Sequence, residues 1–328
     1  MVSSTVEKVV QYGLRIKRGG SLVTASETPS DESNRSESGM SYAEIHPNWD
    51  REPEYITEGF SLEMSAKDVD SLREAAPKIP KETPIAVTFL PGETLDARLA
   101  AAREVRAQGF EPMPHFSARR FKSEGEFRTM VERMVEEADV RRCFAIAGDP
   151  PTPEGPFSET AELIETGLFE KNGIVAIGMA GHPQGHPNMT EEECFEVVER
   201  KCAMILERGM KPLIVTQFGF DPDAFMRWLV ELRKRGIDTP VRIGVPGPTN
   251  ITSLLRFAAR CGVEASASVM RKYGVSLGKL VGVAGPDKMV NAFAAGLKSG
   301  HHPVRLHFYP FGGLSRTVDW IAKYNAAH

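Results

Sequence analysis

Two carboxylates stand out as candidates for acid–base chemistry. Glu63 lies inside the apolar run 60–64, and Asp149 directly follows the apolar run 142–148 and precedes two prolines. A carboxylate in a buried strand loses hydration, which should raise its pKa and suit it to donate a proton as a general acid. The alternatives are a structural ion pair with a buried arginine or lysine for Glu63, and a turn residue ahead of prolines for Asp149.

Other polar side chains fall inside or just after further apolar runs, where they could contact a ligand. His182 and His186 have an HxxxH spacing, which on a helix would present two imidazoles to zinc. Pro183 and Pro187 argue against such a helix, so we expect these histidines to hydrogen-bond a ligand and expect no metal. The remaining candidates of this kind are Thr88, His115, Gln217 and Tyr309.

These candidates are embedded in a regular alternation of short apolar runs and longer amphipathic segments. Thr190 and Asn250 are typical helix N-caps, because each precedes an apolar run with helical spacing. The expected strands are 60–64, 85–90, 110–115, 142–148, 173–180, 212–220, 241–246 and 304–309. The expected helices are 68–76, 95–108, 124–138, 159–169, 191–207, 223–235, 251–261 and 287–298.

Eight strands alternating with helices predict an α/β fold of the (β/α)8 TIM-barrel type. A doubly wound open sheet is the alternative, because periodicity does not show closure. In a barrel, active-site residues lie at the C-terminal ends of the strands, so the candidate residues should converge there. We expect residues 58–328 to form the barrel and residues 1–57 to form an N-terminal extension, partly a mobile linker rich in Ser and Glu.

Composition and missing motifs exclude several other functions. The 40 basic and 44 acidic residues give a net charge of -4, which argues against nucleic-acid or anionic-membrane partners. The sequence has no membrane-length apolar run and no signal-peptide pattern, and its four cysteines form no CxxC pair, so we expect a cytoplasmic protein. No dinucleotide-binding GxGxxG, P-loop or GxSxG motif is present, so any nucleotide must be held by barrel loops.

The order of the motifs resembles the methylenetetrahydrofolate reductases. The matching segments run from about residue 58 to 325 and are SLEM, AVTF, PMPH, AIAGD, GHPQGHP, IVTQFGFD, VPGPTNITSLLRFA and LHFYPF. The resemblance implies an FAD-containing barrel that passes a hydride from NADH or NADPH through the flavin to methylenetetrahydrofolate. Net oxidation of methyltetrahydrofolate is the alternative direction at the same site.

The resemblance also assigns roles to individual residues. Glu63 would protonate the folate N10, and Asp149 would lie between the flavin pyrimidine edge and the folate pterin. A carboxylate beside the flavin would lower the reduction potential of the flavin. The implied FAD contacts are Thr88, His115, Gly148, Asp149, His182 and His186, and the implied tetrahydrofolate contacts are Glu63, Gln217 and Tyr309.

Three positions depart from the family pattern. Ala147 stands where the family commonly has Arg before Gly-Asp, Ile251 stands where it commonly has an aromatic residue, and the segment AMILERG replaces a basic pair. The missing charges would face the FAD diphosphate, so we expect compensation from Arg119 and Arg120, or from Arg200 and Lys201. The alternatives left open are an electron donor other than NAD(P)H and a folate-binding subunit without flavin chemistry. We also expect a homo-oligomer.

Overall fold

Eight parallel strands form a closed barrel in this computed structural model, which describes residues 51–263, 265, 270 and 283–328. The sheet closes where the last strand, β10, pairs with the first strand, β1, through Ser61↔His307 and Leu62↔Phe308. Closure confirms the predicted barrel and rules out the open doubly wound sheet. The barrel strands are β1 (Ser61–Met64), β2 (Pro84–Val87), β3 (Glu111–Ser117), β4 (Arg142–Ile146), β5 (Ala176–Gly181), β6 (Lys211–Thr216), β7 (Val241–Pro246) and β10 (Val304–Tyr309).

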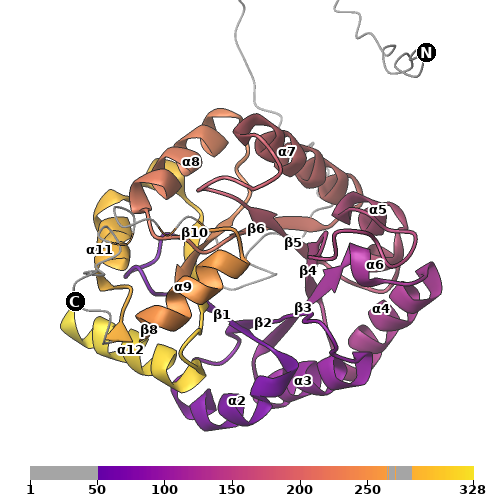
Figure 1. Cartoon of the computed structure of the whole chain (residues 1–328), viewed down its shortest axis with the longest axis horizontal. Helices are drawn as coiled ribbons and strands as arrows, with labels where there is room; N and C mark the ends of the chain where they lie inside the picture. The colour runs from indigo at the N-terminus through magenta and orange to yellow at the C-terminus, as the bar shows by residue number, and fades with distance from the viewer. Residues whose placement is uncertain (1–50, 264, 266–269, 271–282) are drawn as a thin grey trace, which may run out of the picture. The chain divides into compact units, whose positions relative to one another are not determined.

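Helices surround the barrel as an outer layer, which Figure 1 shows looking into the barrel. The α-helices are α2 (Val69–Ala75), α3 (Leu95–Ala107), α4 (Glu124–Ala138), α5 (Thr160–Glu165), α6 (Leu168–Lys171), α7 (Glu191–Glu207), α8 (Pro222–Lys234), α9 (Ile251–Arg260), α11 (Asp287–Gly296) and α12 (Leu314–Ala327). Short 3-10 turns are η1 (Ala66–Asp68), η2 (Ala76–Lys78), η3 (Ala118–Arg120) and η4 (Ser299–His301). Side-chain caps begin several helices: Thr94, Ser123, Thr190 and Asn250 each accept a backbone N–H of the first turn.

Most expected elements are present, but three expectations need correction. The expected helix 159–169 is two helices, α5 and α6, because Gly167 at φ 71° breaks the helical backbone between them. Strands β2 and β6 end at Val87 and Thr216, earlier than expected. The helix that follows the last strand, α12, was not predicted, and the expected segment 287–298 instead corresponds to α11, which precedes that strand.

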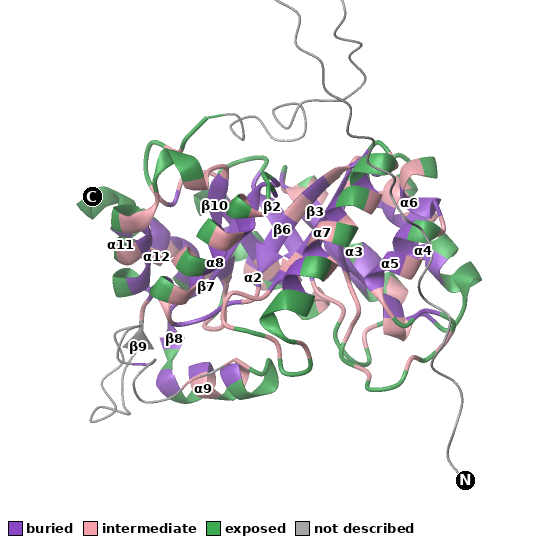
Figure 2. Cartoon of the chain, turned by 90° about the horizontal axis from the view of Figure 1, so that it is seen from above, coloured by how far each residue is buried: buried purple, intermediate pink, exposed green. Residues whose placement is uncertain are grey.

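Helix α9 lies apart from the outer layer. In Figure 1 it crosses in front of the barrel opening, and in Figure 2 it lies beyond the ends of the strands, next to the small antiparallel pair β8 (Thr249–Asn250) and β9 (Val283–Ala284). The helix follows the C-terminal end of β7, so it lies at the C-terminal end of the barrel, hereafter called the mouth. A Cβ on Gly262, just past α9, would come 3.5 Å from Pro187 in the loop after β5.

The core has two layers because strand side chains alternate between the barrel interior and the helices. The interior holds Ala86, Met113, Phe144 and Val215. The larger layer lies between strands and helices, and Figure 2 shows the strands as mostly buried. Side chains that belong to this interior face and lie near the C-terminal ends of the strands therefore point toward the mouth.

Candidate active site

The polar residues singled out in the sequence lie at the mouth of the barrel. Glu63 and His115 lie on β1 and β3, and Tyr309 is the last residue of β10. The others lie within three residues after their strands: Thr88 after β2, Gly148 and Asp149 after β4, His182 after β5 and Gln217 after β6. Lys201 lies farther along the chain, on α7.

Glu63 faces two buried histidines. Its Oε2 lies 3.6 Å from Nε2 of His115 and 3.9 Å from Nε2 of His307. Desolvation lowers the pKa of His115 to about 4 and lowers that of His307, so both rings are neutral near pH 7. Within the described chain, the basic side chains that lie within 4 Å of the Glu63 carboxylate are therefore these two neutral imidazoles, and not the buried arginine or lysine of the structural ion-pair alternative.

His307 is a site residue that the sequence analysis did not assign. Its Nδ1 lies 2.8 Å from the hydroxyl of Ser61, which fixes the ring so that Nε2 points toward Glu63. Strand parity could have identified it, because His307 lies two residues before Tyr309 on β10 and so shares its interior face.

A small cradle of hydroxyl groups lies at the ends of β2, β3 and β4. Thr88 Oγ1 and Ser117 Oγ are buried and have no hydrogen-bond partner among the described residues. Buried hydroxyls are normally satisfied, so these two are available to a bound group. Gly148 lies beside Ser117 at φ 96°, and a Cβ there would come 3.2 Å from Cβ of Ser117. The glycine therefore keeps the cradle open.

Asp149 and the two arginines of η3 form a polar cluster next to the cradle. Asp149 accepts hydrogen bonds from Arg120, one of them from Nε at 3.1 Å. Arg119 instead donates to backbone carbonyls of the loop after β4, those of Ser158 at 2.8 Å and Pro150 at 3.3 Å. Both arginines expected to face a diphosphate are thus engaged by the β4–α5 loop.

A second group of basic side chains comes from the loop after β5 and from α7. The rings of His182 and His186 are 4.8 Å apart, and desolvation together with the neighbouring positive charge of Lys201 lowers the pKa of His182 to about 4. Burial also lowers the pKa of Lys201 to about 8. Arg200 is paired with Glu159 at 2.7 Å. Lys201 is therefore a partly buried cation near a neutral histidine.

Aromatic rings line the remaining wall of the mouth. Phe257 on α9 stacks on Phe311 with ring centroids 4.2 Å apart, and Phe311 stacks on Tyr309 at 5.9 Å. Tyr309 donates its hydroxyl to the carbonyl of Thr216 at 2.9 Å, which fixes the ring at the end of β6. The three rings are only partly buried, so they present apolar surface to the mouth.

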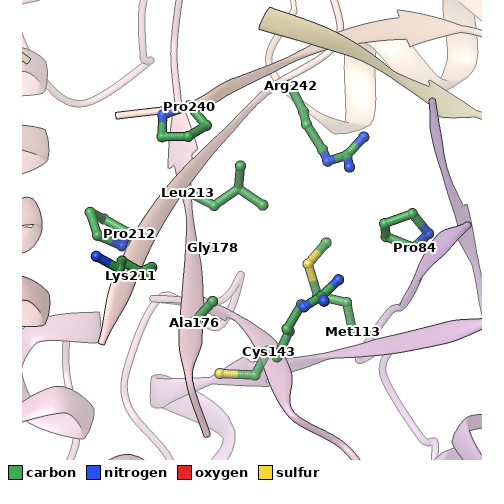
Figure 3. A pocket seen from close by; sticks show the side chains of 11 residues that line it. Pro84, Met113, Cys143, Ala176, Gly178, Lys211, Pro212, Leu213, Pro240 and Arg242 are labelled. Carbon is green, nitrogen blue, oxygen red and sulfur yellow. The ribbon is translucent and has the colours of Figure 1, made fainter. Parts of the chain in front are cut away.

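The cavity in Figure 3 lies at the other end of the barrel and is distinct from this site. Its volume is about 30 Å³, and its lining includes Pro84, Arg142, Lys211 and Arg242 near the N-terminal ends of their strands. Among the described residues, no group of three or more His, Cys, Asp or Glu side chains could hold a metal ion. The same part of the chain contains no helix that is long and apolar enough to cross a membrane.

The family model of methylenetetrahydrofolate reductase matches residues 56–312. The chain belongs to this family. Methylenetetrahydrofolate reductase 2 of Saccharomyces cerevisiae is 31% identical over 142 residues, 40% of this chain and 23% of the yeast protein. The 5,10-methylenetetrahydrofolate reductase of Pectobacterium carotovorum is 26% identical over 157 residues, 48% of this chain and 50% of the bacterial protein.

The methylenetetrahydrofolate reductase match thus spans most of the barrel, while the chain covers only a quarter to a half of these relatives' own length. A solved structure with a similar fold is that of an uncharacterized protein from Clostridium thermocellum, described as binding two copies of 5-methyl-5,6,7,8-tetrahydrofolic acid. It aligns with a TM-score of 0.55 at 12% identity and covers 81% of this chain and 96% of that chain. This similarity shows the barrel fold.

Proposed function

We propose that the protein is a flavin-dependent oxidoreductase that interconverts 5,10-methylenetetrahydrofolate and 5-methyltetrahydrofolate with NADH or NADPH as the electron donor. The observation that carries the proposal is the contact of Glu63 with two neutral histidines, next to a cradle of unpartnered hydroxyls. Family membership supports the reaction class. The balanced reaction is NAD(P)H plus H⁺ plus methylenetetrahydrofolate giving NAD(P)⁺ plus methyltetrahydrofolate.

Glu63 supplies the proton of this reaction. It protonates N10 of the folate, which opens the five-membered ring and leaves an iminium carbon that accepts a hydride. His115 and His307 lie within 4 Å of the carboxyl group and carry no charge near pH 7, so neither forms an ion pair with Glu63. The half-buried position of Glu63 limits its contact with water.

The residues of the mouth fit a flavin. Thr88 and Ser117 offer unsatisfied hydroxyls, Gly148 leaves the adjoining space open, and Lys201 with His182 offers a cation and a neutral donor for the diphosphate side. The bound FAD would supply the two-electron chemistry that side chains lack. The aromatic wall formed by Tyr309, Phe311 and Phe257 would pack against the folate rings, in place of an aromatic residue at Ile251.

The proposal is tested with the purified protein loaded with FAD and its Glu63→Gln variant. We expect the visible flavin absorption of both proteins to bleach anaerobically on addition of NADH or NADPH, because Glu63 takes no part in that step. Reoxidation by methylenetetrahydrofolate should slow at least about 100-fold in the variant, since the general acid is lost. Equal reoxidation rates in the two proteins would contradict the role of Glu63.

Two further outcomes point to the alternative functions. Bleaching by methyltetrahydrofolate but by neither pyridine nucleotide would indicate a different electron partner. A failure to take up FAD would favour a folate-binding subunit, and one observation agrees with this alternative: Arg119, Arg120 and Arg200 are all engaged by other protein groups.

A further inference from the structure

Arg120 holds a position that neither the proposed reaction nor the expected diphosphate contact explains. Its side chain is 11% exposed, whereas that of its partner Asp149 is 68% exposed. The guanidinium carbon lies 5.6 Å from the centre of the Phe89 ring, which the guanidinium of Arg98 also approaches, at 3.7 Å. Arg120 is thus a largely buried cation that reaches a carboxylate at the edge of the mouth.

The backbone fixes the Arg120–Asp149 pair from both sides. The amide of Arg119 donates to the carbonyl of Ala147 at 2.9 Å, and the amide of Glu154 donates to the carbonyl of Arg119 at 2.8 Å. A Cβ on Gly155 would come 2.3 Å from the carbonyl oxygen of Phe121, so the loop after β4 packs directly on η3. This close packing of the loop after β4 on η3 holds Arg120 and Asp149 next to each other.

We propose that Arg120 is a positioning residue that orients Asp149 and raises the reduction potential of a flavin bound in the cradle of Thr88, Ser117 and Gly148. The inference rests on the proposed function, because it concerns the redox group of that same site. It differs from the diphosphate contact expected from the sequence, because the hydrogen bonds of Arg120 go to Asp149 and its second carboxylate contact is Glu154 at 3.9 Å.

The physical reason is the sign of the charges next to the cradle. A flavin gains two electrons on reduction and becomes more negative, so a lone Asp149 carboxylate would oppose reduction and a guanidinium beside it would favour reduction. With the pair intact, the two effects largely cancel. The flavin then accepts electrons from NAD(P)H or from methyltetrahydrofolate more readily than it would next to an isolated carboxylate.

The experiment measures the flavin midpoint potential and the FAD dissociation constant of the wild-type protein and four variants. The variants are Arg120→Gln, Asp149→Asn, the double variant, and Arg128→Gln as a control. Arg128 is a half-exposed residue of α4 paired with Glu124 at 3.0 Å, so its replacement makes the same charge change on the outer layer. The flavin midpoint potential is the decisive measurement. A loss of packing alone would change protein stability and FAD affinity, but it would not shift the potential in a predictable direction.

We expect Arg120→Gln to lower the potential by at least a tenfold change in the two-electron reduction equilibrium, which is about 30 mV. Asp149→Asn should raise it, the double variant should return close to wild type, and Arg128→Gln should leave it unchanged.

An Arg120→Gln protein that binds FAD with the wild-type potential overturns the inference and leaves the proposed function intact. Weaker FAD binding without a change in potential also overturns it and assigns Arg120 to the diphosphate. A wild-type protein that binds no FAD overturns the proposed function, and this inference with it.

Discussion

Desolvation controls the protonation of the histidines at the mouth. His115 is buried beneath the rim of the barrel and packs against Phe144 with ring centroids 4.7 Å apart. Its carbonyl oxygen accepts a hydrogen bond from the buried guanidinium of Arg98. The neighbouring Arg98 and His307 act in the same direction as desolvation, so the pKa of His115 falls to about 4 although Glu63 opposes the shift.

This depressed pKa predicts a loss of stability in mild acid. Above about pH 6.5, His115 is neutral in both the folded and the unfolded chain and contributes nothing to the pH dependence. Between about pH 6.5 and pH 4, the unfolded chain binds a proton that the folded chain does not, so the free energy of unfolding falls by up to about 3 kcal/mol. Urea unfolding at pH 7 and pH 4.5 should show a smaller loss for His115→Gln than for wild type. The same loss in both proteins would exclude His115 as its source.

At the residue scale, the sequence indicated single strand-end positions better than pairs of residues. Glu63, His115 and Tyr309 could be found because a polar residue in an apolar strand is visible in the sequence itself. His307 was missed although it shares the interior face of its strand with Tyr309, and the pairing of Arg120 with Asp149 was not predicted. That pair depends on how the loops after β3 and β4 pack together, which no local pattern encodes.

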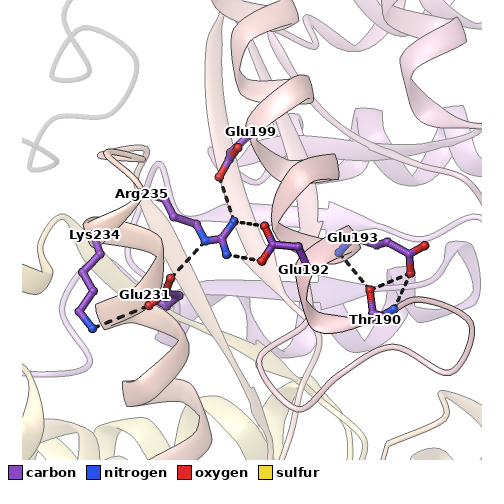
Figure 4. A network of polar contacts seen from close by, with 7 residues as sticks. All are labelled: Thr190, Glu192, Glu193, Glu199, Glu231, Lys234 and Arg235. Carbon is purple, nitrogen blue, oxygen red and sulfur yellow. Dashed lines mark hydrogen bonds and ion pairs between the residues drawn. The ribbon is translucent and has the colours of Figure 1, made fainter. Parts of the chain in front are cut away.

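At the element scale, helix α7 carries the partly buried Lys201 and is fixed at its start and along its side. Thr190 caps it: its Oγ1 accepts from the Glu193 amide at 3.3 Å, and the Glu193 carboxylate accepts from the Thr190 amide at 2.7 Å. Arg235, just past α8, binds Glu192 and also contacts Glu199 of α7 (Figure 4). The cap and this cross-link set the position of Lys201 relative to the mouth.

The cap supports a prediction for Thr190→Ala. Loss of the capping oxygen leaves a first-turn amide without its partner and should lower the free energy of unfolding by about 1 kcal/mol. Thr190→Ser keeps the oxygen and should remain close to wild type, so the pair isolates the cap from the lost methyl group. Chemical denaturation of the three proteins measures the difference. Equal stabilities of the Ala and Ser variants would mean that the cap contributes nothing.

Helix ends were predictable where a cap or a glycine marks them, as for α7 and α9. The break at Gly167 was missed, because a glycine within an amphipathic pattern does not reveal the sign of its φ angle. Helix α12 was missed because the expected set of eight helices was filled by assigning both α9 and α11 as outer helices. Only the structure shows that α9 crosses the mouth.

At the scale of the whole molecule, closure depends on the contact between the first and last strands. The alternation of strands and helices predicted the number of strands, but pairing between residues about 245 positions apart is a tertiary property. The seam between β1 and β10 is sealed by Phe308, which is fully buried and lies 6.0 Å from the ring of Phe60 and 5.8 Å from that of Trp320. The ring thus joins both strands to the last helix, α12.

Because the pairing of β1 with β10 closes the barrel, we expect the barrel to unfold as one unit. Phe308→Ala removes a buried ring and should lower the free energy of unfolding by about 3–5 kcal/mol, while Phe308→Leu, which refills most of the space, should cost less than about 1.5 kcal/mol. Far-ultraviolet circular dichroism reports all elements, and tryptophan fluorescence includes Trp320 at the seam. The two signals should change at the same denaturant concentration in wild type and in both variants, because opening the seam exposes the interior of every strand. A fluorescence transition that precedes the loss of secondary structure would show instead that β10 and α12 detach while the other strands stay folded.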